Sequence, residues 1–127
     1  MAVSSPLILV VDDEINMRNI LRRILEKEGY QVLTAPDGET ALRIIKAREP
    51  EVILLDLMMP GIDGREVSWR VREFSPSTRI IYFTAKTELT SPLKVKELHK
   101  GADAFIAKPA TSKRILSMVD NMLNNRR

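Results

Sequence analysis

The sequence predicts an α/β fold in which short strands and helices alternate along the chain. Apolar runs lie at Leu7–Val11, Val52–Leu55 and, apart from its first residue, Arg79–Phe83. Unbroken runs of this kind are typical of strands that are buried on both faces of a parallel sheet. Between the runs, apolar residues recur at the three- and four-residue spacing of amphipathic helices. A strand–helix unit repeated five times therefore predicts a parallel sheet covered by helices.

The first three helices have clear boundary signals. The first helix ends before Gly29, because glycine favours the left-handed conformation that terminates helices. The second helix begins at a cap on Asp37 and ends at Pro50. The third helix carries apolar residues such as Val67 and closes before Pro76. These signals place one helix after each of the first three strands.

The remaining elements are shorter or have weaker patterns. The second and fifth strands are expected at Gln31–Ala35 and Ala104–Ala107. A fourth helix is expected at Leu93–Leu98, and a fifth begins at a cap on Thr111 or Ser112. With these elements the chain completes five strand–helix units.

Length and composition favour one globular domain over residues 1–127, with its core at about residues 7–122. The chain is 44% hydrophobic and 29% charged, and its lack of cysteine excludes disulfides and thiolate metal sites. Because we find neither a span of ~18 apolar residues nor a signal-peptide pattern, we expect a cytoplasmic protein without membrane contact. The net charge of +3 gives no reason to expect direct nucleic-acid binding.

Acidic residues lie where two of the expected strands end. Asp12 and Asp13 follow the first strand, and Asp56 follows the third. In the strand order 2-1-3-4-5 these strands are neighbours, and ligands bind beyond their carboxyl ends. Two unit charges about 4 Å apart repel by roughly 4 kcal/mol at an effective dielectric constant of 20, so clustered acids need a cation or raised pKa values. Oxygen ligands with free positions for water and phosphate suit Mg²⁺.

Each candidate residue also has a simpler interpretation. Asp12 or Asp13 could cap the first helix, and Asp56 could be a solvated turn residue. Thr84 could be an ordinary strand end, and Lys108 an ordinary exposed lysine. Taken together at one sheet edge, however, these residues favour a site for a cation and a phosphoryl group.

Several motifs occur in order along the chain. They are LVVDDE at Leu9–Glu14, DLMMPGIDG at Asp56–Gly64, Thr84-Ala85, Gly101–Asp103 and Lys108-Pro109. Together they resemble the receiver domain of response regulators in two-component signalling systems. The resemblance runs from about residue 7 to residue 122 and implies a flavodoxin-like (βα)5 fold with the strand order 2-1-3-4-5.

The resemblance implies a magnesium-dependent phosphoacceptor. Asp56 would be phosphorylated, and Asp13 and Asp56 would bind Mg²⁺ by their side chains. Asp12 would bind the ion through a coordinated water, and Met58 through its backbone carbonyl. The protein would then be a regulatory phosphoacceptor that assists its own phosphorylation and dephosphorylation, not an enzyme.

The resemblance also implies a phosphate contact and a conformational switch. Thr84 and Lys108 would bind phosphoryl oxygens, and the Lys108–Pro109 peptide bond would be cis. Thr84 and Phe105 would form the switch, although Phe105 could equally be a core strand residue. The switch would alter the face made by the fourth helix, the fifth strand and the fifth helix.

The partners that the resemblance implies follow from this chemistry. A sensor histidine kinase or a phosphotransfer domain would donate the phosphoryl group, and an effector or output domain would read the switched face. A homodimer is compatible with this scheme. Two alternatives remain: a receiver-like interaction module that is never phosphorylated, and an aspartyl-phosphate phosphatase of the haloacid dehalogenase type. The phosphatase fits less well, because phosphatases of that type have a spacer residue between the two acids after the first strand, whereas Asp12 and Asp13 are adjacent.

Two positions bear on how long a phosphoryl group would stay on Asp56. In the family, the residues two places after the acceptor and two places after the threonine influence the loss of phosphate. Here these residues are Met58 and Lys86. A thioether is a weak acceptor and a charged lysine accepts no hydrogen bond, so neither side chain orients an attacking water. The pair therefore predicts a long-lived phosphoaspartate.

Overall fold

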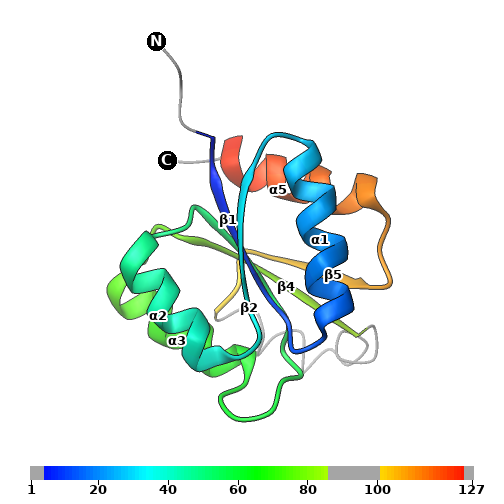
Figure 1. The fold of residues 1–127 in the computed structure, drawn as a ribbon. Coiled ribbons are helices and arrows are strands. Elements are labelled where there is room, and N and C mark those ends of the chain that lie inside the picture. Colours follow the sequence, from blue (N-terminus) through cyan, green and yellow to red (C-terminus); the bar gives the residue numbers. More distant parts are fainter. Residues whose placement is uncertain (1–4, 86–100, 125–127) are drawn as a thin grey trace.

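The computed structural model describes residues 5–85 and 101–124. Its sheet has the order β2-β1-β3-β4-β5, and every neighbouring pair of strands is parallel. The fold class and the strand order are therefore as predicted (Figure 1). The strands are β1 (Leu7–Val11), β2 (Gln31–Ala35), β3 (Val52–Leu55), β4 (Arg79–Ala85) and β5 (Ala104–Lys108).

The helices in the described part of the chain are α1 (Ile15–Lys27), α2 (Gly38–Arg48), α3 (Gly64–Phe74) and α5 (Ser112–Asn124). The side chain of Asp37 caps α2 by accepting a hydrogen bond from the Thr40 N–H at 2.8 Å, as predicted. The Thr111 hydroxyl accepts from the Arg114 N–H at 3.1 Å, so Thr111 caps α5 and not Ser112. The helix expected at 93–98 lies outside the described residues.

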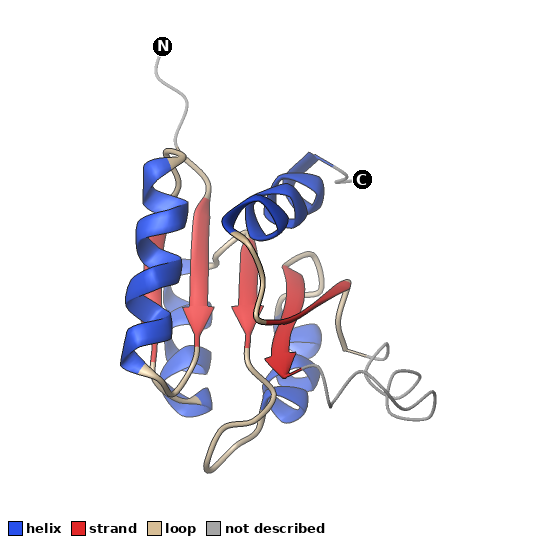
Figure 2. Cartoon of the chain, turned by 90° about the vertical axis from the view of Figure 1, so that its right-hand side faces the viewer, coloured by secondary structure: helices blue, strands red, loops and turns tan. Residues whose placement is uncertain are grey.

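Helices cover both faces of the sheet (Figure 2). One apolar cluster joins α2 and α3 to one face, and a second joins α1 and α5 to the other. β1 contributes Leu9 and Val11 to the first cluster and Ile8 and Val10 to the second. The apolar runs are thus buried on both faces, as their lack of alternation predicted.

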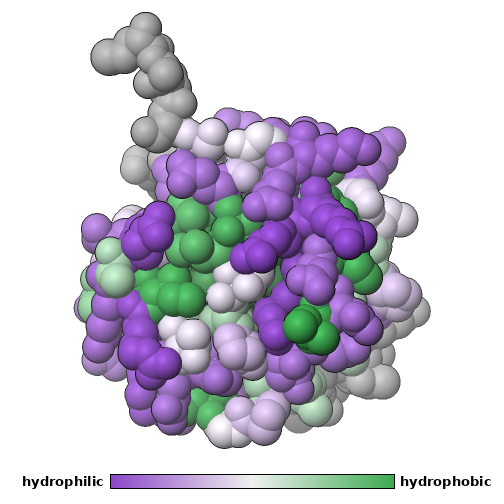
Figure 3. Space-filling view, in the orientation of Figure 1, coloured by the Kyte–Doolittle hydropathy of each residue, from purple (hydrophilic) through white to green (hydrophobic). Residues whose placement is uncertain are grey.

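The distribution of apolar and polar side chains on the surface reflects these layers. Seen from the β2 edge, apolar side chains show between the helical layers and hydrophilic ones cover most of the remaining face (Figure 3). Among the helices of the described residues, none is long and apolar enough to cross a membrane.

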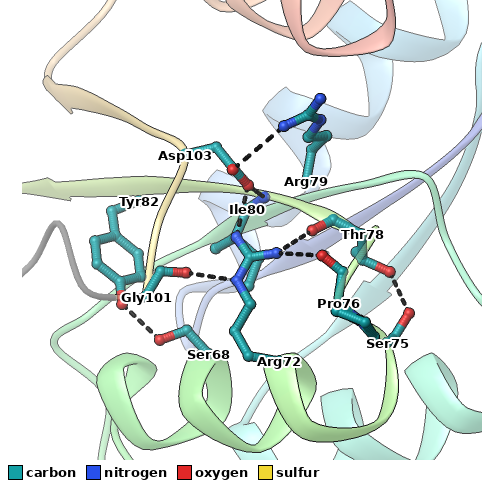
Figure 4. A network of polar contacts seen from close by, with 10 residues as sticks. All are labelled: Ser68, Arg72, Ser75, Pro76, Thr78, Arg79, Ile80, Tyr82, Gly101 and Asp103. Carbon is teal, nitrogen blue, oxygen red and sulfur yellow. Dashed lines mark hydrogen bonds and ion pairs between the residues drawn. The ribbon is translucent and has the colours of Figure 1, made fainter. Parts of the chain in front are cut away.

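A polar network holds the start of β5 against α3 (Figure 4). The Arg72 guanidinium donates to the backbone oxygens of Gly101 at 3.2 Å and Thr78 at 2.6 Å. It also donates to Oδ2 of Asp103 at 2.6 Å, and the same oxygen accepts from the Ile80 N–H at 2.8 Å. Since Asp103 directly precedes β5, the network sets where that strand enters the sheet.

Candidate functional site

The predicted acids meet at the carboxyl ends of β1 and β3. Asp12, Asp13 and Asp56 each offer a carboxylate oxygen, and these atoms lie within 4.8 Å of one another. They converge because β1 and β3 are paired up to Val11 and Leu55, the residues just before the acids. Asp12 and Asp56 are buried and Asp13 is exposed. A cluster of hard oxygen donors that opens to solvent on one side fits a divalent cation such as Mg²⁺.

Asp12 belongs to the turn between β1 and α1. Its Oδ1 accepts from the Glu14 N–H at 2.9 Å, and its backbone oxygen accepts from the Arg18 guanidinium at 2.8 Å. The N-cap residue of α1 is Glu14, which makes no side-chain capping bond. The interpretation of Asp12 or Asp13 as the helix cap is therefore not what the structure shows.

Asp56 is held by the loop that follows β3. Its Oδ1 accepts from the Met58 N–H at 3.1 Å. Gly64 packs closely against its backbone, since a Cβ atom on Gly64 would lie 2.6 Å from the Asp56 carbonyl oxygen. Burial raises the pKa of Asp56 above its usual value, although the Met58 N–H and the positive charge of Lys108 act in the opposite direction. The side chain is thus a poorly solvated carboxylate in a fixed position.

Lys108 brings a positive charge to the acids. Its Nζ lies 2.7 Å from Oδ2 of Asp12 and 3.4 Å from Oδ2 of Asp56. Nζ also lies 5.2 Å from the centre of the Phe83 ring. Burial lowers the pKa of Lys108, but the hydrogen bond to Asp12 and the charges of both acids outweigh it and raise that pKa above the usual value. The ammonium therefore stays charged. The Lys108–Pro109 peptide bond is cis, the isomer that the resemblance implies.

Thr84 lies at the same edge of the sheet. It pairs with Ala107 in the ladder between β4 and β5, one position before the pair formed by Ala85 and Lys108. Thr84 is fully buried, and its hydroxyl has no hydrogen-bond partner within the described residues. Buried hydroxyls in folded proteins are nearly always paired, so this one is suited to donate to a ligand atom.

Comparison with known proteins assigns this arrangement to a family. The sequence model of the response regulator receiver domain matches residues 8–120. The chain belongs to this receiver family. The receiver is 40% identical over 116 residues to the alkaline phosphatase synthesis transcriptional regulatory protein PhoP of Bacillus subtilis, covering 91% of this chain and 48% of PhoP. It spans about half the length of the curated relatives that it matches.

Solved structures agree with the family. Chemotaxis protein CheY4 of Vibrio cholerae superposes with a TM-score of 0.86 at 32% identity, over 94% of this receiver and 99% of CheY4. Response regulator TrrA of Thermotoga maritima, in complex with Mg²⁺ and BeF, gives a TM-score of 0.81 at 34% identity, over 92% of this receiver and 98% of TrrA.

Phe105 of the receiver lies in the ladder between β4 and β5, opposite Tyr82. The two ring centres are 5.8 Å apart, and the rings are tilted by 59°. Phe105 is partly buried and packs against the cluster beneath α2 and α3. The Tyr82 hydroxyl is itself hydrogen-bonded to the Ser68 hydroxyl of α3 at 2.6 Å. Phe105 is thus a residue of the core. It also lies on β5, next to the strand that carries Thr84, which is a position compatible with a switch residue.

Some supporting contacts were missed in the sequence. Arg18 and Phe83 had no signal, because their contacts with Asp12 and Lys108 depend on side-chain reach across elements. Gly64 did have a signal in the sequence, because it follows Asp63. The Asp63 side chain caps α3 by accepting a hydrogen bond from the Glu66 N–H at 3.1 Å. An Asp-Gly pair soon after a strand can mark a helix start packed against that strand.

Proposed function

We propose that this receiver accepts a phosphoryl group on Asp56 from a sensor histidine kinase or a phosphotransfer domain, with Mg²⁺ as cofactor. One observation carries the proposal: three carboxylates lie within 4.8 Å of one another beside the ammonium of Lys108. Family membership supports it, and so does the likeness to TrrA, whose structure holds Mg²⁺ and BeF. Residues 1–127 would then be a single receiver domain.

The acids would hold the metal in distinct ways. Asp13 and Asp56 would bind Mg²⁺ through their side chains, Asp12 through a water, and Met58 through its backbone carbonyl. When bound, Mg²⁺ supplies positive charge that offsets the acids and the incoming phosphoryl oxygens. The carboxylate oxygens that gather at this edge of the sheet are hard donors, which Mg²⁺ prefers as ligands.

The chemistry of the receiver's own residues is simple. A carboxylate oxygen of Asp56 forms a bond to phosphorus while the phosphorus–nitrogen bond of the donor phosphohistidine breaks, and the electron pair leaves with the imidazole. A carboxylate needs no general base for this step. Lys108 pairs with one phosphoryl oxygen, and the Thr84 hydroxyl, which has no partner among the described residues, donates to another. Catalysis is then positioning and charge neutralisation.

Phosphorylation would also act as a switch. It replaces a carboxylate with a group that carries a charge of about −1.5 to −2. Thr84 would move toward the new oxygens, and Phe105 would fill the space that it leaves. This shift would change the face that β5 and α5 share with the helix expected at 93–98, where an effector, an output domain or a second receiver would bind.

Uptake of one phosphoryl group tests the proposal. Incubation with phosphoramidate or acetyl phosphate and Mg²⁺ should raise the intact mass by one phosphoryl group, and a chelator should prevent it. Asp56→Asn should take up nothing. No uptake by the wild type would favour the interaction module that is never phosphorylated. Steady release of phosphate from small phosphomonoesters would favour the phosphatase.

A further inference from the structure

Met58 is the most exposed methionine in the described part of the chain. Met58 is 57% exposed, whereas Met59, the next residue, is 8% exposed. The others are partly buried: Met17, Met118 and Met122. The Met58 backbone N–H also donates to Oδ1 of Asp56 at 3.1 Å. The residue that carries this accessible thioether is therefore hydrogen-bonded, through its backbone, to the proposed phosphoacceptor.

We propose that Met58 is a reversible oxidation site, and that its sulfoxide shortens the lifetime of phosphorylated Asp56. The oxidant is a peroxide or hypochlorous acid. The inference rests on the proposed function, because it names a regulation of the same site. It requires two properties that the structure supplies together: one methionine that is much more exposed than the others described, and a backbone contact of that residue with the acceptor.

The oxidation step is a two-electron oxygen transfer. A lone pair of the Met58 sulfur attacks one oxygen of hydrogen peroxide, and the oxygen–oxygen bond breaks. The sulfur becomes a sulfoxide, and the departing hydroxide takes up the remaining proton and leaves as water. Solvent access sets the order of reaction, so Met58 oxidises before the partly buried methionines and well before Met59. Methionine sulfoxide reductases reverse the step.

The sulfoxide changes what the side chain can hold. A thioether is a weak hydrogen-bond acceptor, whereas the sulfoxide oxygen is a strong one. An acceptor two residues from Asp56 can orient a water in line with the phosphorus. That water forms a bond to phosphorus while the bond from phosphorus to the Asp56 oxygen breaks, which releases inorganic phosphate and restores the carboxylate. Oxidation thus converts a shielding side chain into one that assists hydrolysis.

The first test follows the oxidation itself. Graded treatment of the whole protein with hydrogen peroxide, followed by peptide mass mapping, should show sulfoxide at Met58 before Met17, Met118 or Met122. This readout needs no phosphorylation. A different order of oxidation would overturn the inference.

The second test follows phosphate loss after donor removal, and it compares each variant with itself before and after peroxide. The wild-type rate should rise by at least about threefold on oxidation, as expected when a water becomes oriented. Met58→Leu should show no response, and the matched control Met122→Leu should keep the wild-type response. Met58→Gln, whose amide oxygen sits on the δ atom as the sulfoxide oxygen does, should lose phosphate faster than wild type without peroxide.

The outcomes separate this inference from the function on which it rests. The inference alone would be overturned if phosphorylated protein lost phosphate at the same rate before and after Met58 oxidation. It would also be overturned if peroxide accelerated phosphate loss in Met58→Leu as much as in wild type. Untreated protein that takes up no phosphoryl group would overturn the proposed function, and this regulation with it.

Discussion

Asp56 is a buried carboxylate that lies beside a second buried acid, Asp12. Its position at a strand end was predictable, because an acid that follows an apolar run stands out in the sequence. The preference of Lys108 for Asp12, at 2.7 Å against 3.4 Å for Asp56, was not predictable. Which of two nearby acids a lysine contacts depends on side-chain packing, and no sequence spacing encodes that.

The raised pKa of Asp56 leads to a stability prediction. Because burial raises its pKa in the folded state, the wild type loses stability relative to Asp56→Asn as pH rises through that pKa. The variant should be more stable near neutral pH, by about 1 kcal/mol, because it removes a charge whose burial is only partly offset by the Met58 N–H and Lys108. Thermal unfolding of the metal-free proteins at several pH values measures the difference.

Asp37 is the matched control for this experiment. The capping hydrogen bond from the Thr40 N–H lowers its pKa, so its contribution to stability is present above the unfolded-state pKa and disappears as pH falls. Asp37→Asn should therefore gain no stability near neutral pH. An Asp56→Asn variant that is less stable than wild type at neutral pH would contradict the view that burial of the Asp56 charge destabilises the folded protein.

Met58 leads to a prediction about phosphate lifetime in the unoxidised protein. Its thioether cannot orient water, so Met58→Asn and Met58→Glu should lose phosphate faster than wild type by several-fold. The measurement is the decay of phosphorylated protein after the donor is removed. If both variants decay at the wild-type rate, the shielding argument is wrong. The companion residue of this argument, Lys86, lies outside the described residues.

At the scale of elements, the sequence predicted where the strands lie better than it predicted the residues at which they end. β4 reaches Ala85 and β5 reaches Lys108, so both strands run past the apolar residues that marked them. They extend because backbone pairing continues through Thr84 with Ala107 and Ala85 with Lys108. Hydrogen bonding between strands that are distant in sequence decides such ends, and side-chain hydropathy does not report it.

The Arg72 network is an element-scale feature that no sequence pattern predicted. Its partners Gly101 and Asp103 follow Arg72 by 29 and 31 residues. Arg72→Met would leave backbone oxygens and a carboxylate without this donor, so we expect a loss of about 2 kcal/mol in the free energy of unfolding. Chemical denaturation measures it.

Arg70→Met provides the matched control on the same helix. Arg70 pairs with Glu66 one turn away, and both side chains are about half exposed at 51% and 46%. Pairs of this kind contribute only about 0.3–0.5 kcal/mol. Equal losses for the two variants would show that the network does not hold β5 in place.

At the scale of the whole molecule, the strand order creates the site. β1 and β3 are neighbours although β2 lies between them in sequence, and this brings Asp12 and Asp13 to Asp56. The sequence could predict this order only through the family resemblance, because burial patterns alone do not choose among parallel arrangements. The hydroxyl of Thr84 and the charge of Lys108 then arrive from β4 and β5 at the same edge.

Metal binding is a property of this assembled site. Isothermal titration with Mg²⁺ should detect one site in the wild type and none in Asp13→Asn, because the variant loses a side-chain ligand. Lys108→Met should bind Mg²⁺ more tightly, by about tenfold, because the ammonium that now neutralises Asp12 would be gone. Equal affinities in all three proteins would place the metal elsewhere.

The most direct test of the central claim is to locate the phosphoryl group. Borohydride reduces the acyl phosphate of an aspartate to homoserine, which peptide mass spectrometry identifies by residue. After treatment with phosphoramidate and Mg²⁺, we predict homoserine at position 56 and unmodified aspartate at positions 12 and 13. Homoserine at position 12 or 13, or none at position 56 in protein that has gained a phosphoryl group, would contradict it.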